Sequence, residues 1–572
     1  MFPQSNSFRQ KISLDGFWDF RFDPKREGEA RGWFDGVAAT RPIAVPASWN
    51  DQFADERDNL GPAWYQTRFD LPWGWRGQRI YVRFGSVNYL AEVWLNGIKV
   101  GRHEGGHLPF DLDLTDHVRE ADNLLVVRVD GNLTRHTVPP GDVPPDPLHS
   151  FAIVHYPSVN FDFFPYCGIH RPVLLYTKPS RGIDDVTVIT DIEDSTGIVQ
   201  IKVAGGVDDD TVRVKLRGHG VELVGESAAR EITFNIRSAA LWNIGEPNLY
   251  EVIVDLIREG EVCDRYLLRI GIRTIKVDGN ALLLNGKPIY LKGFGRHEDF
   301  FVVGRGLLPS LIIKDYDLMR LVGANSFRTS HYPYSDEMMD LADQLGVLVI
   351  DETPAVGLFF DRDGLAQRLA LCRKQVREMI ARDKNHPSVV MWSLANEPHS
   401  HFDSAHTFIR DLYDLAKSLD PTRPITITSH VGIKEESFEF LDVVCLNRYY
   451  GWYTEAGQIE AGVKRLAEEI DAIHARYPKP FILTEFGADA TAGFHAQPAE
   501  MFSEEFQAEM IAAYIDVLRA RPFVAGEHVW TMCDFKTAQA VRRMNGMNYK
   551  GVFTRDRKPK LAAHRLKEIW KL

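Results

Sequence analysis

The pattern of apolar and polar positions changes twice along the chain and divides it into three regions. Up to about residue 180, short runs alternate between apolar and polar positions, and Gly, Pro, Asn and Asp separate them. This alternation is typical of the strands of an antiparallel sandwich, here a jelly-roll-like domain over residues 1–180. About seven further alternating runs over residues 181–276 predict a smaller immunoglobulin-like β-sandwich.

After residue 276, continuous apolar runs alternate with amphipathic segments, of which residues 366–383 are an example. There are eight such runs: IYLKGFGRHE, ANSFRTSH, VLVIDE, VVMWSLANEP, ITITSH, VVCLNRYY, FILTEFG and EHVWTMCDF. Continuous apolar runs are typical of parallel strands that are buried on both faces, and the eightfold alternation predicts a (β/α)8 TIM barrel over residues 277–572.

Composition and charge narrow the possible functions. The 572 residues are 44% hydrophobic and 26% charged, which is typical of a globular protein, and the net charge of −12 disfavours nucleic acid as a partner. An acidic substrate would need a locally basic pocket. The five cysteines are scattered, so we expect neither disulfides nor a zinc site, and no cofactor or metal. Because we find neither a signal peptide nor a run of about 18 apolar residues, we expect a cytoplasmic protein without membrane contact. As a separate expectation, the chain forms a homo-oligomer.

Polar residues gather where the predicted barrel strands end, which is where TIM barrels carry their chemistry. These strand ends contain His297–Glu298, Arg328–His331, Asp351–Glu352, Asn396–Glu397, His430, Asn447–Tyr450, Glu485 and Asp534. Glu397 and Glu485 follow the fourth and seventh runs, so they would face each other across the barrel mouth. Retaining glycosidases use two carboxyl groups about 5–5.5 Å apart. A single strand-end Glu is often a helix cap or an ion-pair partner, but the pairing favours catalysis.

Two segments resemble the signature motifs of glycoside hydrolase family 2: NSFRTSHYP (325–333) and DKNHPSVVMWSLANE (383–397). The order of the three predicted domains is also similar to that family, and the likeness covers nearly the whole chain. The resemblance implies that Glu397 is the acid/base and Glu485 the nucleophile, and that the hydroxyl of Tyr449 orients the nucleophile.

Within the family, the chain looks most like β-glucuronidases, in blocks such as KGFGRHED, IDETPAVG, LNRYYGWY, TEFGAD and KGVFTRDRKPK. Asn548 and Lys550 match the Asn-x-Lys motif that binds the glucuronate carboxylate, which an ammonium and an amide N–H suit by charge-assisted hydrogen bonds. Without the resemblance, Lys550 reads as part of a solvated basic run. The resemblance implies that the other substrate-binding residues are Asp162, His331, Asn396, Asn447, Tyr453, Trp530 and Arg543.

Other functions fit the sequence less well. A metal-dependent barrel hydrolase would need two His one residue apart after the first strand, where this chain has His297 and Glu298. A GxSxG nucleophile motif and a glycine-rich phosphate loop are absent from the sequence. The alternatives that stay open are a β-galacturonidase or β-galactosidase, and more remotely a non-catalytic carbohydrate-binding protein.

The connection after the third barrel strand predicts an aglycone preference. From Ala355 to Leu365 it is only about ten residues long, whereas some bacterial relatives carry a long loop there, above the active site. A short connection leaves the leaving-group side open. We therefore expect oligosaccharide or natural-product glucuronides to have a higher kcat/KM than small, flat drug glucuronides. Equal or faster turnover of bulky aryl glucuronides than of uronic oligosaccharides would contradict this expectation.

Overall fold

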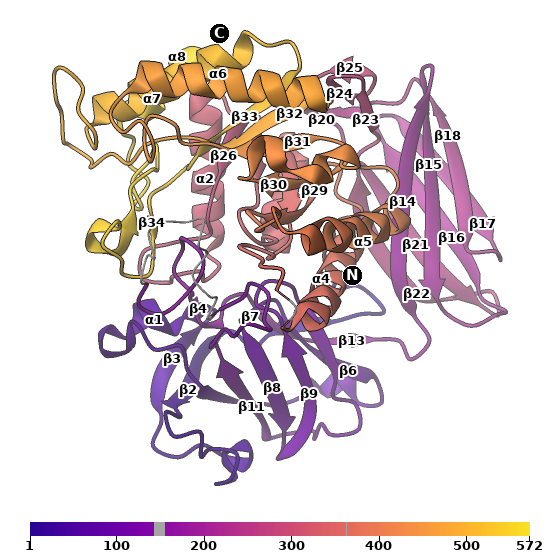
Figure 1. Cartoon of the computed structure of the whole chain (residues 1–572). Coiled ribbons are helices and arrows are strands. Elements are labelled where there is room, and N and C mark those ends of the chain that lie inside the picture. The colour runs from indigo at the N-terminus through magenta and orange to yellow at the C-terminus, as the bar shows by residue number, and fades with distance from the viewer. Residues whose placement is uncertain (142–154, 362, 572) are drawn as a thin grey trace.

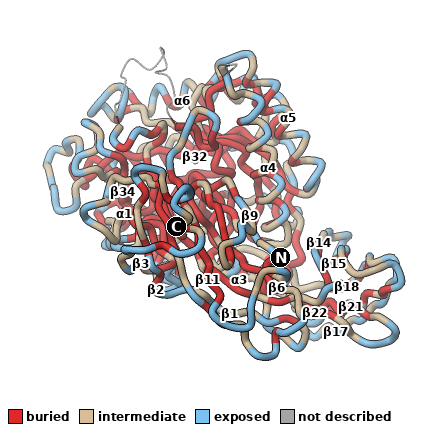
Figure 2. The backbone as a smooth tube through the Cα atoms, turned by 90° about the horizontal axis from the view of Figure 1, so that it is seen from below, coloured by how far each residue is buried: buried red, intermediate tan, exposed pale blue. Residues whose placement is uncertain are grey.

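The computed structural model describes residues 1–141, 155–361 and 363–571, which form three parts (Figure 1). A β-sandwich lies against the barrel at the bottom of the view, and an immunoglobulin-like sandwich lies beside the barrel. Buried residues fill the interior of each part (Figure 2). This arrangement confirms the predicted fold class. No helix in these described ranges is long and apolar enough to cross a membrane.

The N-terminal sandwich consists of two antiparallel sheets and a short third one. In β5, alternate side chains such as Tyr65 enter the core with Trp18 and Phe20 of β2, which explains the alternating pattern. The four-stranded sheet has the order β1 (Lys11–Ser13), β13 (Val173–Lys178), β6 (Arg79–Phe84), β10 (Phe110–Asp113). The six-stranded sheet has the order β3 (Arg41–Val45), β2 (Gly16–Phe22), β5 (Ala63–Phe69), β11 (Asn123–Asp130), β8 (Leu90–Leu95), β9 (Ile98–Glu104). The short sheet comprises β4 (Ala47–Ser48), β12 (Gly168–Ile169) and β7 (Val87–Asn88).

The second domain is a sandwich of seven strands in two sheets. In β18, burial alternates residue by residue, so that Ile232, Phe234 and Ile236 face the core. One sheet contains β14 (Ile183–Glu193), β15 (Thr196–Gly205) and β18 (Glu231–Arg237). The other contains β17 (Val221–Ser227), β16 (Thr211–Gly218), β21 (Tyr250–Arg258) and β22 (Glu261–Ile270).

The third domain is a closed barrel of eight parallel strands, which follow one another around the ring in chain order. Seven of the eight apolar runs of the sequence contain one of these strands, while the eighth run begins at Glu527 and covers only the second half of β33 (Val524–Trp530). Strand β33 pairs with β26 (Leu291–Gly295) to close the ring. The strands are β26 (Leu291–Gly295), β27 (Ser326–Arg328), β28 (Leu348–Glu352), β29 (Val389–Asn396), β30 (Ile425–Ser429), β31 (Val444–Asn447), β32 (Phe481–Glu485) and β33 (Val524–Trp530).

Helices surround the barrel, with one departure from regular alternation. Between β30 and β31 the chain forms two short 3₁₀ helices, η4 (Gly432–Lys434) and η5 (Glu436–Glu439), in place of an α-helix. The barrel helices are α2 (Pro309–Val322), α3 (Asp336–Leu345), α4 (Leu365–Asp383), α5 (Asp403–Leu419), α6 (Ile459–Arg476), α7 (Glu504–Arg519) and α8 (Leu561–Trp570). A small sheet of β23 (Ile275–Asp278), β24 (Ala281–Leu284) and β25 (Lys287–Pro288) packs Leu282 and Leu284 against the bottom of the barrel.

The two sandwiches contact opposite ends of the barrel strands. At the start of β29, the guanidinium of Arg273 donates to the carbonyl of Val389 at 2.7 Å, which fixes the second domain to the bottom of the barrel. The first domain instead contacts the segments that follow the strands. The amide of Phe164 donates to the carbonyl of Lys536 at 2.9 Å, and Arg171 donates to that of Pro333 at 2.7 Å. The first domain therefore forms one wall of the barrel mouth.

Candidate active site

Two glutamates lie at the barrel mouth, at the ends of the fourth and seventh barrel strands, as the sequence predicts. Glu397 directly follows β29, and Glu485 is the last residue of β32. Glu485 is 4% exposed, while Glu397 is half-buried. The Asn447 amide, at the end of β31, donates to Oε1 of Glu397 at 2.8 Å. The barrel thus directs two carboxyl groups into one mouth and holds them by different neighbours.

Three groups on neighbouring strand ends are directed at the Glu485 carboxylate. The Arg328 guanidinium forms an ion pair with Oε1, and the hydroxyl of Tyr449 donates to Oε2 at 2.7 Å. Nε2 of His331 lies 3.6 Å from Oε1. The predicted contact between Tyr449 and Glu485 is therefore present as a hydrogen bond.

Arg328 joins Glu485 to a third carboxylate, Glu352 at the end of β28. Its Nη1 lies 2.7 Å from Oε1 of Glu352, and all three side chains are buried. The Ser393 hydroxyl also donates to Glu352, at 2.7 Å, and Nδ1 of His331 lies 2.8 Å from it. Burial by itself disfavours the charged guanidinium, but the two carboxylates outweigh it and raise the pKa of Arg328. Arg328 is therefore a permanent cation beneath the site.

The environments of the two glutamates shift their pKa values in opposite directions. Burial, together with the charge of Glu397, raises the pKa of Glu485 above its ordinary value, although Arg328 opposes the shift. Burial also disfavours ionisation of Glu397, but the charge of His430 and the amide of Asn447 outweigh it and lower the pKa of Glu397. Because the two carboxyl groups interact, the apparent pKa values belong to the pair.

A second group of polar side chains, which we call the Lys550 cluster, lies at the same mouth. It comprises Asp162, Tyr453, Asp489, Arg543, Asn548 and Lys550. Lys550 is 1% exposed, whereas Lys558 of the same basic run has a side chain that is 77% exposed. The solvated alternative for Lys550 is therefore wrong. Its Nζ donates to the hydroxyl of Tyr453 at 3.0 Å and forms an ion pair with Asp489.

The first domain supplies one member of the Lys550 cluster. Asp162 accepts hydrogen bonds from Nε of Arg543 at 2.7 Å and from the amide of Asn548 at 2.9 Å. Arg543 therefore reaches the mouth, where its Nη2 also donates to the hydroxyl of Tyr453 at 3.0 Å. Residues far apart in the sequence meet here because the first domain covers this side of the barrel.

The remaining predicted residues line the floor of the mouth. The rings of His331 and Trp530 stack at 5.1 Å between centroids, with 18° between their planes. The Asn447 amide, which holds Glu397, also donates to Oδ1 of Asn396 at 3.3 Å. The structure thus brings all of the predicted residues to one end of the barrel, in two linked groups around Glu485 and Lys550.

Sequence reasoning gave no role to three residues that are central to this geometry. Arg328 and Glu352 were noted only as polar residues at strand ends. No role was predicted for Asp489, which lies four residues after Glu485 in TEFGAD. A buried strand end that carries an ionisable residue is the signal that was available for the first two. No comparable signal marks Asp489, because its partner Lys550 lies 61 residues further along the chain.

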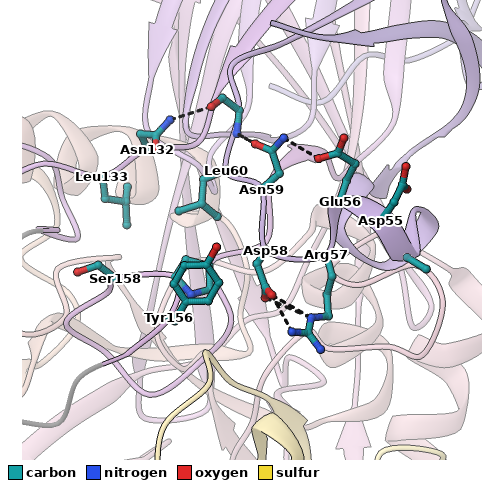
Figure 3. Close-up of a pocket in the computed structure, with 13 residues that line it drawn as sticks. Asp55, Glu56, Arg57, Asp58, Asn59, Leu60, Asn132, Leu133, Tyr156 and Ser158 are labelled. Carbon is teal, nitrogen blue, oxygen red and sulfur yellow. Dashed lines mark hydrogen bonds and ion pairs between the residues drawn. The ribbon is translucent and has the colours of Figure 1, made fainter. Parts of the chain in front are cut away.

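Two other features do not belong to this mouth. A polar hollow of about 850 Å³ is formed by loops of the first domain near Asp58, Asn59, Asn132 and Tyr156 (Figure 3), and it contains none of the predicted site residues. The residues Asp340, Asp343 and His386 have the spacing of a metal site. Asp343 accepts a hydrogen bond from Nδ1 of His386 at 2.6 Å and, against the effect of burial, raises its pKa to about 9, which favours an ion pair between these two residues.

A pair of carboxyl groups at the mouth of a TIM barrel, beside a polar cluster and under a β-sandwich, is typical of a glycoside hydrolase. Family models confirm this class. The "Glycosyl hydrolases family 2, sugar binding domain" matches residues 11–179, "Glycosyl hydrolases family 2" matches 182–273, and the family's "TIM barrel domain" matches 275–572. The chain belongs to glycoside hydrolase family 2.

Relatives resemble the chain over its whole length. The "Beta-glucuronidase" of Paenibacillus borealis is 41% identical and that of Sus scrofa 39%, with all of this chain and 98% and 92% of the relatives covered. A solved β-glucuronidase of an uncultured Clostridium sp. has a TM-score of 0.94 at 40% identity, covering 100% of this chain and 99% of that one. The Ruminococcus gnavus enzyme, solved in complex with D-glucaro 1,5-lactone, has a TM-score of 0.94 at 36% identity, with the same coverage.

The hydrogen bond from Asn447 to Glu397 predicts a pH effect. The amide stabilises the charged carboxylate and so lowers the pKa of Glu397; replacing Asn447 by Ala removes this donor, and the pKa rises. We expect the apparent pKa values in the pH profile of kcat/KM for an aryl glycoside to move to higher pH. Asn385→Ala is the control, because this amide contacts the carbonyl of Val186, away from the mouth. An unchanged or lowered profile for Asn447→Ala would contradict the assignment.

Proposed function

We propose that this chain is a retaining β-glucuronidase, with Glu485 as the nucleophile and Glu397 as the acid/base. The observation that carries the proposal is the buried Lys550 ammonium with Asn548 and Arg543, at the same mouth as the two glutamates. A buried cation at a sugar site favours a substrate that carries a carboxylate. The names of the relatives support the same substrate class.

The reaction proceeds in two displacements. Glu485 attacks the anomeric carbon while Glu397 gives its proton to the leaving oxygen, so the glycosidic bond breaks and a covalent glycosyl-enzyme forms. Glu397, now a carboxylate, takes a proton from a water molecule. The oxygen of that water attacks the anomeric carbon, and the bond between this carbon and Glu485 breaks. Two inversions leave the configuration of the sugar unchanged. This scheme needs no cofactor.

Hydrogen bonding supports this division of roles. Arg328 and Tyr449 both contact Glu485, so its carboxylate is oriented and its negative charge is balanced. Glu397 has the donor Asn447 and is more open to the mouth. The protein groups around Glu397 hold its pKa below that of an ordinary Glu, which is the reverse of what a proton donor needs. A bound sugar removes water from Glu397, and this desolvation favours its protonated form.

The contacts of the Lys550 cluster suggest how a uronate is bound. Lys550 has three N–H donors and Asn548 two, so both can serve a carboxylate while keeping their protein partners. A neutral hydroxymethyl group would offer the remaining N–H donor of the ammonium no charged acceptor, at a cost of roughly 1–3 kcal/mol. This feature favours a β-glucuronidase over a β-galactosidase.

The substrate of a β-galacturonidase differs from a glucuronide only in the orientation of one hydroxyl. Initial rates with aryl β-D-glucuronide, galacturonide, galactoside and glucoside therefore test the assignment directly.

Replacing either glutamate by Ala tests the mechanism. We expect Glu485→Ala and Glu397→Ala each to abolish turnover of an aryl β-glucuronide, because one removes the attacking group and the other the proton donor. Thermal unfolding should show that both variants stay folded. Turnover of Glu485→Ala within about tenfold of the wild type would refute the role of Glu485 as the nucleophile. Removing the nucleophile of a covalent mechanism lowers kcat by far more than that.

Replacing Lys550 by Ala tests the substrate class. The variant loses the ammonium N–H that donates to the uronate carboxylate, so the ratio of kcat/KM for glucuronide to that for glucoside should fall steeply. The control is Lys558→Ala, which removes an exposed lysine of the same run. An unchanged ratio for Lys550→Ala would show that the ammonium does not contact the carboxylate.

A further inference from the structure

The Lys550 ammonium is held by very few groups. Within the described residues its polar partners are Asp489, in an ion pair, and the hydroxyl of Tyr453 at 3.0 Å. The rings of Tyr453 and Trp452 surround the ammonium, with their centroids 4.7 and 5.0 Å from Nζ. An ammonium has three N–H donors, so these two contacts leave one donor for a substrate. The position of that donor depends on Asp489, the charged partner of the two.

Asp489 is itself rigidly held. It is 4% exposed, and its Oδ1 accepts from the backbone N–H of Tyr549 at 2.8 Å while Oδ2 contacts Lys550. Nη1 of Arg543 lies 3.7 Å from Oδ2. Both carboxylate oxygens are thus in use, and each fixes the segment that carries Lys550, one through the backbone and the other through the ammonium. An amide at this position has one oxygen and one NH₂ group, so it faces either the Tyr549 N–H or the Lys550 ammonium with a donor in place of an acceptor.

Charge balance gives Asp489 a second effect. Lys550 and Arg543 carry two positive charges, and Asp489 and Asp162 carry two negative charges, so these four ion-paired groups are neutral before a substrate enters. A uronate carboxylate therefore meets an ammonium that is already paired. Its binding relies on a donor at the right place and not on a surplus of charge.

We propose that Asp489 is a positioning residue that holds the Lys550 ammonium in the orientation needed for a substrate carboxylate, and thereby sets the preference for uronates over neutral sugars. The inference rests on the proposed role of Lys550 in binding the uronate. Asp489 follows Glu485 by four residues, so the same segment that ends in the nucleophile also fixes the carboxylate-binding lysine.

The test compares two lactones that differ only in carboxylate against hydroxymethyl: D-glucaro-1,5-lactone and D-glucono-1,5-lactone. For Asp489→Asn, we expect the inhibition constant of the glucaro-lactone to rise about tenfold or more, which is the effect of losing a charge-assisted contact. The constant for the glucono-lactone should stay within about twofold of the wild type, since it makes no such contact. The KM of an aryl glucuronide should rise in parallel with the first constant.

A double-mutant comparison separates an effect through Lys550 from a general one. If Asp489 acts through Lys550, adding Asp489→Asn to Lys550→Ala changes neither lactone constant further. Asp489→Glu keeps the carboxylate and should recover part of the glucaro-lactone binding, and it serves as the second variant if Asp489→Asn does not fold. The control is Asp420→Asn, which removes a buried carboxylate paired with Arg423 at 2.6 Å and should lower thermal stability without changing the ratio of the two constants.

Each other outcome has one meaning. Equal weakening of both lactones by Asp489→Asn would make Asp489 a purely structural residue, and tighter glucaro-lactone binding would make it a competitor of the substrate carboxylate; either result overturns the inference. If Lys550→Ala lowers the preference but Asp489→Asn and Asp489→Glu do not, the inference alone fails. If Lys550→Ala leaves the preference intact, the uronate assignment fails and the inference fails with it.

Discussion

The site is built around one buried ionic interaction, the Arg328 guanidinium between Glu352 and Glu485. These three side chains come from the ends of the second, third and seventh barrel strands, and all are buried. Removing one partner of a buried ion pair typically costs about 3–5 kcal/mol, because it leaves an uncompensated charge. Arg328 thus has a structural and a chemical effect at once. It ties distant strands together, and it balances a carboxylate that would otherwise be costly to bury.

The first domain is needed to complete the other half of the site. Asp162 comes from the sandwich, yet its carboxylate accepts hydrogen bonds from Arg543 and Asn548 of the barrel. Close packing is required for these contacts, and hydrogen bonds between the domains, such as that from Phe164 to Lys536, supply it. A barrel alone would carry the two glutamates but would leave Arg543 without this carboxylate partner. The three-domain architecture therefore contributes to the geometry of the barrel mouth as well as to stability.

The sequence predicted the architecture well, because the fold follows from patterns that are local. Alternating runs became sandwich strands, and the eight apolar runs became the barrel; the 3₁₀ turns after β30 were missed because that connection has no distinctive period. Pairings between distant residues could not be derived in this way. Lys550 sits in a basic run that reads as solvated, and only the folded barrel shows that the ammonium is buried against Asp489. The resemblance, and not the local pattern, pointed to the correct environment.

The two halves of the site are coupled through the chain itself. Tyr449 bonds to Glu485, and four residues later Tyr453 bonds to Lys550. In the same way, Glu485 is followed after four residues by Asp489, which contacts Lys550 as well. Two short segments after β31 and β32 thus each carry one group to the carboxylate pair and one to the Lys550 cluster. A shift of either segment would move both of its contacts together, so the backbone of these two segments couples the position of the carboxylate pair to that of the Lys550 cluster.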